Sequence, residues 1–151
     1  MTKITHKFLV EQGAKWLHKK ASNVHYRSPF VVTEFVCQGV NEYPDIFGLR
    51  PHGHVLIEVK TSRRDYKRDF KKLGRNNTLD QLGNIRFYLT PKDLIKINEL
   101  PEKWGLLEWN GKKIEVIKKP EQFEGDFQAA GYIYHSILRR KNKYQIFDFK
   151  K

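Results

Sequence analysis

The segment His54–Lys60, with sequence HVLIEVK, constrains the fold of this chain more than any other. Its β-branched residues predict a strand, with Val55, Ile57 and Val59 on one face and Leu56, Glu58 and Lys60 on the other. A strand flanked by helices normally buries apolar side chains on both faces. A carboxylate and an ammonium there are costly unless they pair or serve a ligand. The segment therefore predicts either a structural salt bridge at a sheet edge or a functional site.

The surrounding sequence predicts a single mixed α/β domain. Helices are expected over Thr5–Lys20, from a cap at Thr61 or Ser62 to about Leu73, and over Asp126–Arg140. Further strands are expected over Phe30–Gln38, Pro44–Leu49, Ile85–Thr90, both sides of Asn110–Gly111, and Tyr144–Phe149. Pro91 is expected to open a short helical turn. The apolar face of the last helix is expected to contain Phe127, Ala130, Ile133, Tyr134, Ile137 and Leu138.

Asp45 and Glu58 are candidate ligands for a divalent cation. Asp45 opens the strand that precedes His54–Lys60, so an antiparallel pairing of the two strands would bring both carboxylates to the same end. Carboxylates a few Å apart repel, and Mg²⁺ or Mn²⁺ removes that conflict. Such an ion lowers the pKa of a bound water and stabilises charge on a phosphoryl group. With Lys60 beside them, the two acids suit hydrolysis of a phosphodiester.

The residues Pro44–Asp45, followed after twelve residues by Glu58-Val59-Lys60 and then a helix, resemble the PD-(D/E)XK nuclease superfamily. The resemblance implies a restriction-endonuclease-like αβββαβ core over about residues 5–90, with a hairpin and a helix as an extension over 91–151. It implies that Asp45 and Glu58 bind Mg²⁺ or Mn²⁺, and that Lys60 positions the water or stabilises the transition state. Such families often add an acid from the first helix or strand, here Glu11 or Glu34, and Glu34 is preferred.

The stretch EVKTSRRDYKRDFKK is also similar to small MmcB-type DNA-repair and phage-associated nucleases. That similarity implies roles for Ser62, Asp65, Asp69 and Lys72. The alternatives are purely structural roles. In these, Ser62 is a helix cap, Asp65 and Asp69 form ion pairs with basic residues of their own helix, and Glu34 faces solvent.

Positive charge is the other strong feature of the chain. Lys and Arg number 29 against 17 Asp and Glu, a formal charge of +12. Half of this excess lies in Lys60–Arg75, where eight basic residues face two acids. Polyanions are therefore the expected partners, although a charge run is also typical of a solvated helix face. Contacts with a nucleic-acid backbone are expected from Ser62, Arg63, Arg64, Lys67, Arg68, Lys71 and Lys72.

Several classes of protein are excluded by simpler patterns. No apolar run approaches the length of a membrane span, and the single Cys37 excludes a disulfide framework or a Cys-based zinc site. No P-loop or G-x-G-x-x-G motif is present. The expected function is a cytoplasmic, Mg²⁺-dependent DNA endonuclease of repair, recombination or mobile elements, and a homodimer is left open. The alternatives are a non-catalytic nucleic-acid-binding module on the same fold and an adaptor that docks an acidic protein.

Overall fold

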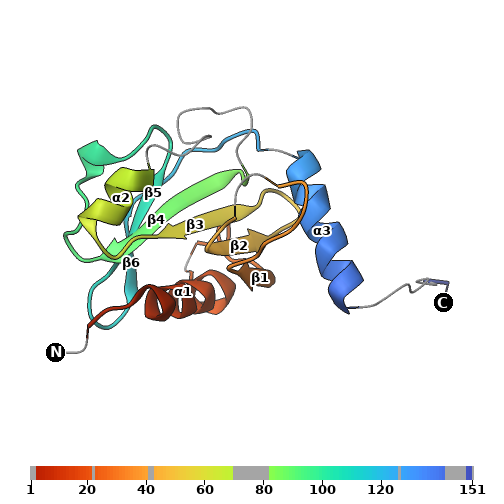
Figure 1. Cartoon of the computed structure of the whole chain (residues 1–151), viewed down its shortest axis with the longest axis horizontal. Helices are drawn as coiled ribbons and strands as arrows, with labels where there is room; N and C mark the ends of the chain where they lie inside the picture. The colour runs from red at the N-terminus through yellow and green to blue at the C-terminus, as the bar shows by residue number, and fades with distance from the viewer. Residues whose placement is uncertain are drawn as a thin grey trace.

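A six-stranded mixed sheet forms the centre of the computed structural model, which describes residues 3–21, 23–40, 43–69, 82–125, 127–141 and 149–150. Helices lie on both sides of the sheet (Figure 1). The helices are α1 (His6–Lys15), which continues as a π-helical turn (Trp16–Lys20), α2 (Arg63–Asp69), a 3₁₀ turn (Ile97–Glu99) and α3 (Phe127–Lys141). The strands are β1 (Phe30–Thr33), β2 (Ile46–Leu49), β3 (Val55–Val59), β4 (Ile85–Pro91), β5 (Gly105–Trp109) and β6 (Ile114–Lys118).

The strands follow one another across the sheet in chain order. β1, β2 and β3 form an antiparallel meander, β3, β4 and β5 are parallel, and β5 and β6 form an antiparallel hairpin. A parallel neighbour needs a crossover, and α2 lies in the connection from β3 to β4. The predicted order of helix, three strands, helix and strand is therefore confirmed, as is the hairpin after it.

The sheet separates two cores. On one face, Val55, Ile57 and Val59 pack with Leu9 and Leu17 of the first helix and its π-helical turn. On the other face, Leu56 packs with side chains of β4, α2 and α3, among them Tyr88, Tyr66 and Ile133. The predicted alternation along β3 is therefore confirmed. Glu58 and Lys60 follow Leu56 on the α2 side, where they are 3% and 8% exposed.

Close packing of α1 on the sheet brings its first turn beside β2. Thr5 caps the helix by accepting a hydrogen bond from Phe8 N at 3.1 Å. A Cβ atom at Gly13 would lie 2.5 Å from Ile46 Cδ1, so a larger residue has no room at this contact. The helix thereby holds His6 near the start of β2.

Two expected elements are shorter in the structure. β1 ends at Thr33 instead of Gln38, because Glu34 adopts a left-handed φ of 47° that turns the chain away, although its N–H still donates to Asp45 O at 2.8 Å. The helical turn expected at Pro91 does not begin there, because Pro91 is the last residue of β4. A single 3₁₀ turn at Ile97–Glu99 follows instead.

α3 buries a different face from the expected one. Ala130 and Ile133 are buried as expected, but Phe127 is 82% exposed and Leu138 51% exposed. The buried positions instead include Ala129 and Ser136. Small residues allow the helix to approach the rest of the domain closely, and this leaves larger apolar side chains outside.

Some expected elements lie outside the described residues, namely positions 70–73 of the basic helix and 144–148 of the last strand. Within the described part of the chain, none of the helices has the length and apolar character needed to cross a bilayer.

Candidate active site

The pairing of β2 with β3 brings the two predicted acids together. Ile46 lies opposite Ile57, so the same register, continued by one residue, places Asp45 opposite Glu58. The carboxylate of Asp45 is fixed from the other strand, since Val59 N donates to its Oδ2 at 2.8 Å. The side chain of Asp45 is 19% exposed, and Glu58 is almost fully buried. Both carboxylates therefore lie at the same end of the two strands.

Asp45, Glu58 and Lys60 line one hollow of about 380 Å³. The other lining residues are His6, Tyr43, Val59, Asp65, Arg68 and Asp69. These residues come from α1, the segment before β2, the end of β3 and α2. The three residues that the sequence analysis selected for chemistry are therefore neighbours, and a part of α2 closes the hollow on one side.

A buried ion pair holds Lys60. Its Nζ lies 3.1 Å from Oδ1 of Asp69, which is fully buried on α2. The other oxygen, Oδ2, accepts a hydrogen bond of 2.5 Å from the hydroxyl of Tyr88 on β4. The carboxylate of Asp69 therefore reaches across to the sheet with both of its oxygens. Asp69 ties the helix to the strand that carries Lys60.

His6 is a neighbour of the site that the sequence analysis passed over. Its Nε2 lies 3.3 Å from Asp45 Oδ1, and its Nδ1 lies 3.8 Å from Glu34 Oε1. The imidazole thus stands between the two carboxylates at the start of α1. No spacing rule marks a single His in a helix as functional, so only the packing of α1 against β2 could reveal this position.

The two candidates for a further acid differ in position. Glu34, whose side chain is 62% exposed, contacts His6 but is not among the residues that line the hollow. Glu11 is exposed on α1 and does not line the hollow either. Glu34 therefore lies at the margin of the site, next to His6, which lines the hollow. Glu11 lies on the surface of α1 and outside the lining of the hollow.

Another acid that the sequence analysis missed lies further along the same face of the sheet. Glu108 on β5 is 7% exposed, and its Oε1 accepts a hydrogen bond from Asp93 N at 3.1 Å. Burial raises the pKa of this carboxyl group, against the opposing effect of that hydrogen bond. Glu108 does not line the hollow, so its position suits the anchoring of the loop after β4.

The residues of α2 divide into a structural and an exposed set. Ser62 caps the helix by accepting a hydrogen bond from Asp65 N at 3.2 Å. Arg63 donates to Leu94 O at 3.0 Å and to both oxygens of Glu99. The hydrogen bonds from Arg63 lower the pKa of Glu99 to about 2, and the same contacts raise the pKa of Arg63. Arg63 therefore anchors the segment after β4, whereas Arg64, Lys67 and Arg68 are exposed.

Two aromatic residues near α2, Tyr66 and Trp104, belong to the core. Tyr66 is 2% exposed, and its hydroxyl donates to Glu99 O at 2.6 Å. Burial is the largest cause that raises the pKa of Tyr66. Trp104 is fully buried and stacks on Tyr88, with ring centroids 4.4 Å apart. Both rings are therefore buried too deeply to stack on a base. Lys71 and Lys72, expected to contact the backbone, fall outside the described residues.

The donor set at the hollow suits a hydrated divalent cation. Within the described ranges no group of three or more His, Cys, Asp or Glu side chains is arranged to hold a metal ion. Of the four carboxylates that line the hollow, Asp45 and Glu58 lie at the adjoining ends of β2 and β3, and the hollow has room for water. Mg²⁺ keeps several waters and commonly takes only one or two protein carboxylates. The residues present therefore fit Mg²⁺ or Mn²⁺, which keep bound waters, better than an ion whose ligands all come from the protein.

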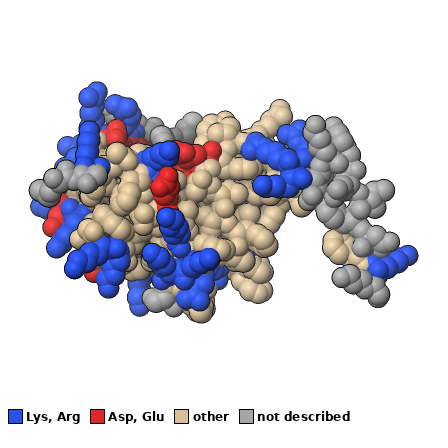
Figure 2. Space-filling view, turned by 90° about the horizontal axis from the view of Figure 1, so that it is seen from below, with Lys and Arg blue, Asp and Glu red and all other residues tan. Residues whose placement is uncertain are grey.

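Figure 2 shows the face that carries α1, where Lys and Arg side chains cover more of the surface than Asp and Glu side chains do. Such a surface attracts a polyanion.

Comparison with known proteins finds a solved structure with a similar fold. No protein-family model matches the chain, and no curated protein matches it. Among solved structures, the SPO1766 protein of unknown function from Silicibacter pomeroyi is similar, with 19% sequence identity and a TM-score of 0.61. The match covers 99% of this chain and 100% of the other. At this identity the likeness shows a shared fold and carries nothing about activity.

Proposed function

We propose that this chain is a divalent-cation-dependent nuclease that hydrolyses phosphodiester bonds of DNA on a restriction-endonuclease-like fold. The observation that carries the proposal is the single hollow where Asp45, Glu58 and Lys60 meet. The fold assignment is supported by the αβββαβ order of α1 to β4, in which β3 and β4 are parallel and α2 connects them.

In this proposal each residue of the site has a separate role. Asp45 and Glu58 hold the cation, which supplies an activated water and stabilises charge that develops on the phosphate. Val59 N fixes the orientation of Asp45 through its hydrogen bond. Lys60 lines the same hollow, and its ammonium lowers the energy of a transition state with extra negative charge.

The remaining groups of the site bind and orient the substrate. Arg68 lines the hollow from α2, and Arg64 and Lys67 are exposed on the same helix. These cations suit contacts with the phosphates on either side of the scissile bond. His6 positions Asp45 through the contact between His6 Nε2 and Asp45 Oδ1.

The test is cleavage of single-stranded, duplex, nicked and branched DNA, and of RNA, by the purified chain with Mg²⁺ or Mn²⁺. Cleavage is expected for DNA and is expected to stop on addition of a chelator. Asp45→Asn should abolish it, whereas Glu11→Gln, a matched change of an exposed acid, should not. If the wild-type chain leaves every substrate intact with both metals, the nuclease proposal is wrong.

A non-catalytic nucleic-acid-binding module is the second candidate, and the ion pair of Lys60 favours it. An ammonium 3.1 Å from a buried carboxylate can serve the fold alone. In that case Asp45→Asn leaves DNA binding unchanged. Replacing Arg64, Lys67 and Arg68 by Gln should weaken binding and flatten its dependence on salt by about 0.9 per lost phosphate contact in a log–log plot. Fluorescence anisotropy with labelled DNA at several salt concentrations measures both effects.

A further inference from the structure

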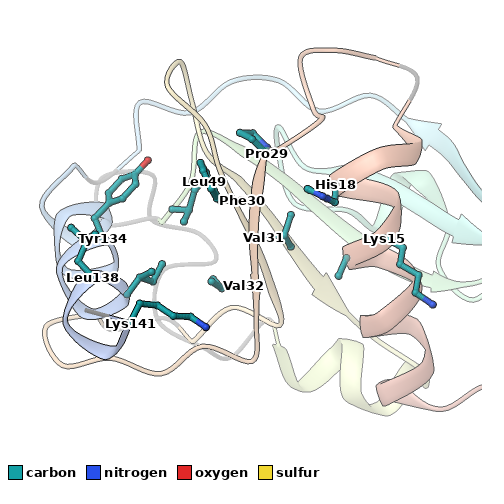
Figure 3. A pocket seen from close by; sticks show the side chains of 12 residues that line it. Lys15, His18, Pro29, Phe30, Val31, Val32, Leu49, Tyr134, Leu138 and Lys141 are labelled. Carbon is teal, nitrogen blue, oxygen red and sulfur yellow. The ribbon is translucent and has the colours of Figure 1, made fainter. Parts of the chain in front are cut away.

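A second hollow, of about 690 Å³, lies along β1 between α1 and α3 (Figure 3). Within the described residues, it shares no lining residue with the candidate active site. In Figure 3, β1 passes between the two helices, with Lys15 and His18 on one side and Tyr134, Leu138 and Lys141 on the other. We name this hollow the β1 groove.

The β1 groove follows the free edge of the sheet. β1 is the first strand in the sheet order, and β2 is the strand that pairs with it within the described part of the chain. Phe30, Val31 and Val32 all line the groove. Consecutive residues of a strand point to opposite faces, so a hollow lined by all three must extend around the edge. A free edge also offers backbone N–H and C=O groups to another strand.

Apolar side chains form the walls of the groove. Phe30 is 69% exposed, and on α3 Leu138 is 51% and Tyr134 40% exposed. These are high exposures for large apolar residues that lie close together, and such patches mark interaction sites. Ala14 on α1 and Ile137 on α3 complete the two walls. An added strand would therefore direct alternate side chains toward α1 and toward α3.

The charges of the residues that line the β1 groove indicate which kind of strand it binds. Lys15 and His18 line the groove beside α1, and Lys141 lines it at the end of α3. Among the lining residues that the structure describes, none is acidic. A second copy of the chain would bring these basic groups and another formal charge of +12 against them. An acidic peptide gains from the same groups, and rim charges of this kind add to the association rate and the specificity.

We propose that the β1 groove binds an extended peptide of a partner protein, which has apolar residues at alternate positions and acidic residues beside them. The peptide adds to β1 as an edge strand, with its main chain hydrogen-bonded to the free edge and its apolar side chains in the two walls. This site lies apart from the proposed nuclease chemistry and does not depend on it.

The experiment is a selection of random octapeptides against the purified full-length chain, followed by anisotropy with the enriched peptides in synthetic form. The enriched sequences are expected to alternate apolar residues and to carry Asp or Glu. Leu138→Glu and Lys141→Glu should each weaken binding about tenfold, a difference of roughly 1.4 kcal/mol. Both side chains are exposed, so these changes spare the fold. Val116→Glu and Lys112→Glu on the β6 hairpin, also exposed, are the matched controls.

Three results would overturn the proposal. The first is a selection that yields no peptide whose binding falls with Leu138→Glu. The second is a set of enriched peptides that depend on the groove but lack acidic residues, which would point to a purely apolar ligand. The third is a concentration-dependent dimer in light scattering that Leu138→Glu dissociates, which would make a second copy the occupant.

Discussion

Replacement of Asp69 should destabilise the fold far more than replacement of its neighbour Asp65. Asp69→Ala removes a fully buried carboxylate, and it leaves the Lys60 side chain, which is only 10% exposed, without its counter-charge. Removing one partner of a buried pair costs about 3–5 kcal/mol. Because Lys60 retains some contact with water, a value near the lower limit, about 3 kcal/mol, is expected. With a urea m-value of about 2 kcal/mol/M, the unfolding midpoint falls by about 1.5 M.

Urea unfolding followed by tryptophan fluorescence measures this loss, and a double-mutant cycle isolates the pair. Asp65→Ala is the matched control, because Asp65 is exposed on the same helix, and its cost should stay below about 1 kcal/mol. The double variant Lys60→Met, Asp69→Leu should cost about 2 kcal/mol less than the sum of the two single changes. A loss under about 1 kcal/mol for Asp69→Ala, or strict additivity in the cycle, would refute the assignment of a stabilising buried pair.

Three other perturbations test separate features. Gly13→Val should lower the free energy of unfolding by about 1–3 kcal/mol, since a side chain there has no room against β2, and thermal unfolding measures it. The pKa of Glu99 is lowered from 4.5 to about 2, so its contact with Arg63 stabilises the fold above pH 4.5 and is lost as the pH falls toward 2. Glu99→Gln should therefore reduce the acid sensitivity of unfolding in that window, and an unchanged profile would contradict it. His6→Asn should lower the turnover of DNA cleavage with little change in stability, because His6 is partly exposed and contacts Asp45; unchanged turnover would remove His6 from the site.

The alternating pattern of β3 predicted the face and the burial of Glu58 and Lys60 because strand periodicity is local. The partner of Lys60 could not be predicted in the same way. α2 has basic or acidic residues at six of its seven positions, and Tyr66 is the exception. The expected helix continues to Phe70 and Leu73, which share one stripe with Tyr66, and Asp69 lies nearer to that stripe than Asp65 does. Helical spacing therefore favours Asp69 as the acid that faces the sheet, but it does not show that Lys60 is the residue it meets there.

The position of His6 depends on two contacts that no local pattern contains. α1 approaches β2 closely at Gly13, and Glu34 leaves β1 in a left-handed conformation. Together these place an imidazole between the carboxylates of Glu34 and Asp45. For α3, helical spacing predicted the buried Ile133 but also placed Leu138 inside. The helix lies beside an open edge of the sheet, so half of its apolar stripe borders the β1 groove instead of the core.

The ion pair of Lys60 is compatible with a catalytic role in the proposed nuclease, and one variant separates that role from a purely structural one. An ammonium has three N–H donors, so a contact with one oxygen of Asp69 leaves donors that can face a phosphate in the hollow. Asp69→Asn keeps the size of the side chain but removes the charge that orients Lys60. If Lys60 stabilises the transition state, this variant should lower kcat for DNA cleavage by at least about tenfold with a small change in KM. Conversely, if the pair serves only the fold, kcat per folded molecule will stay within about twofold, since folding stability alone does not alter the chemistry of the folded state.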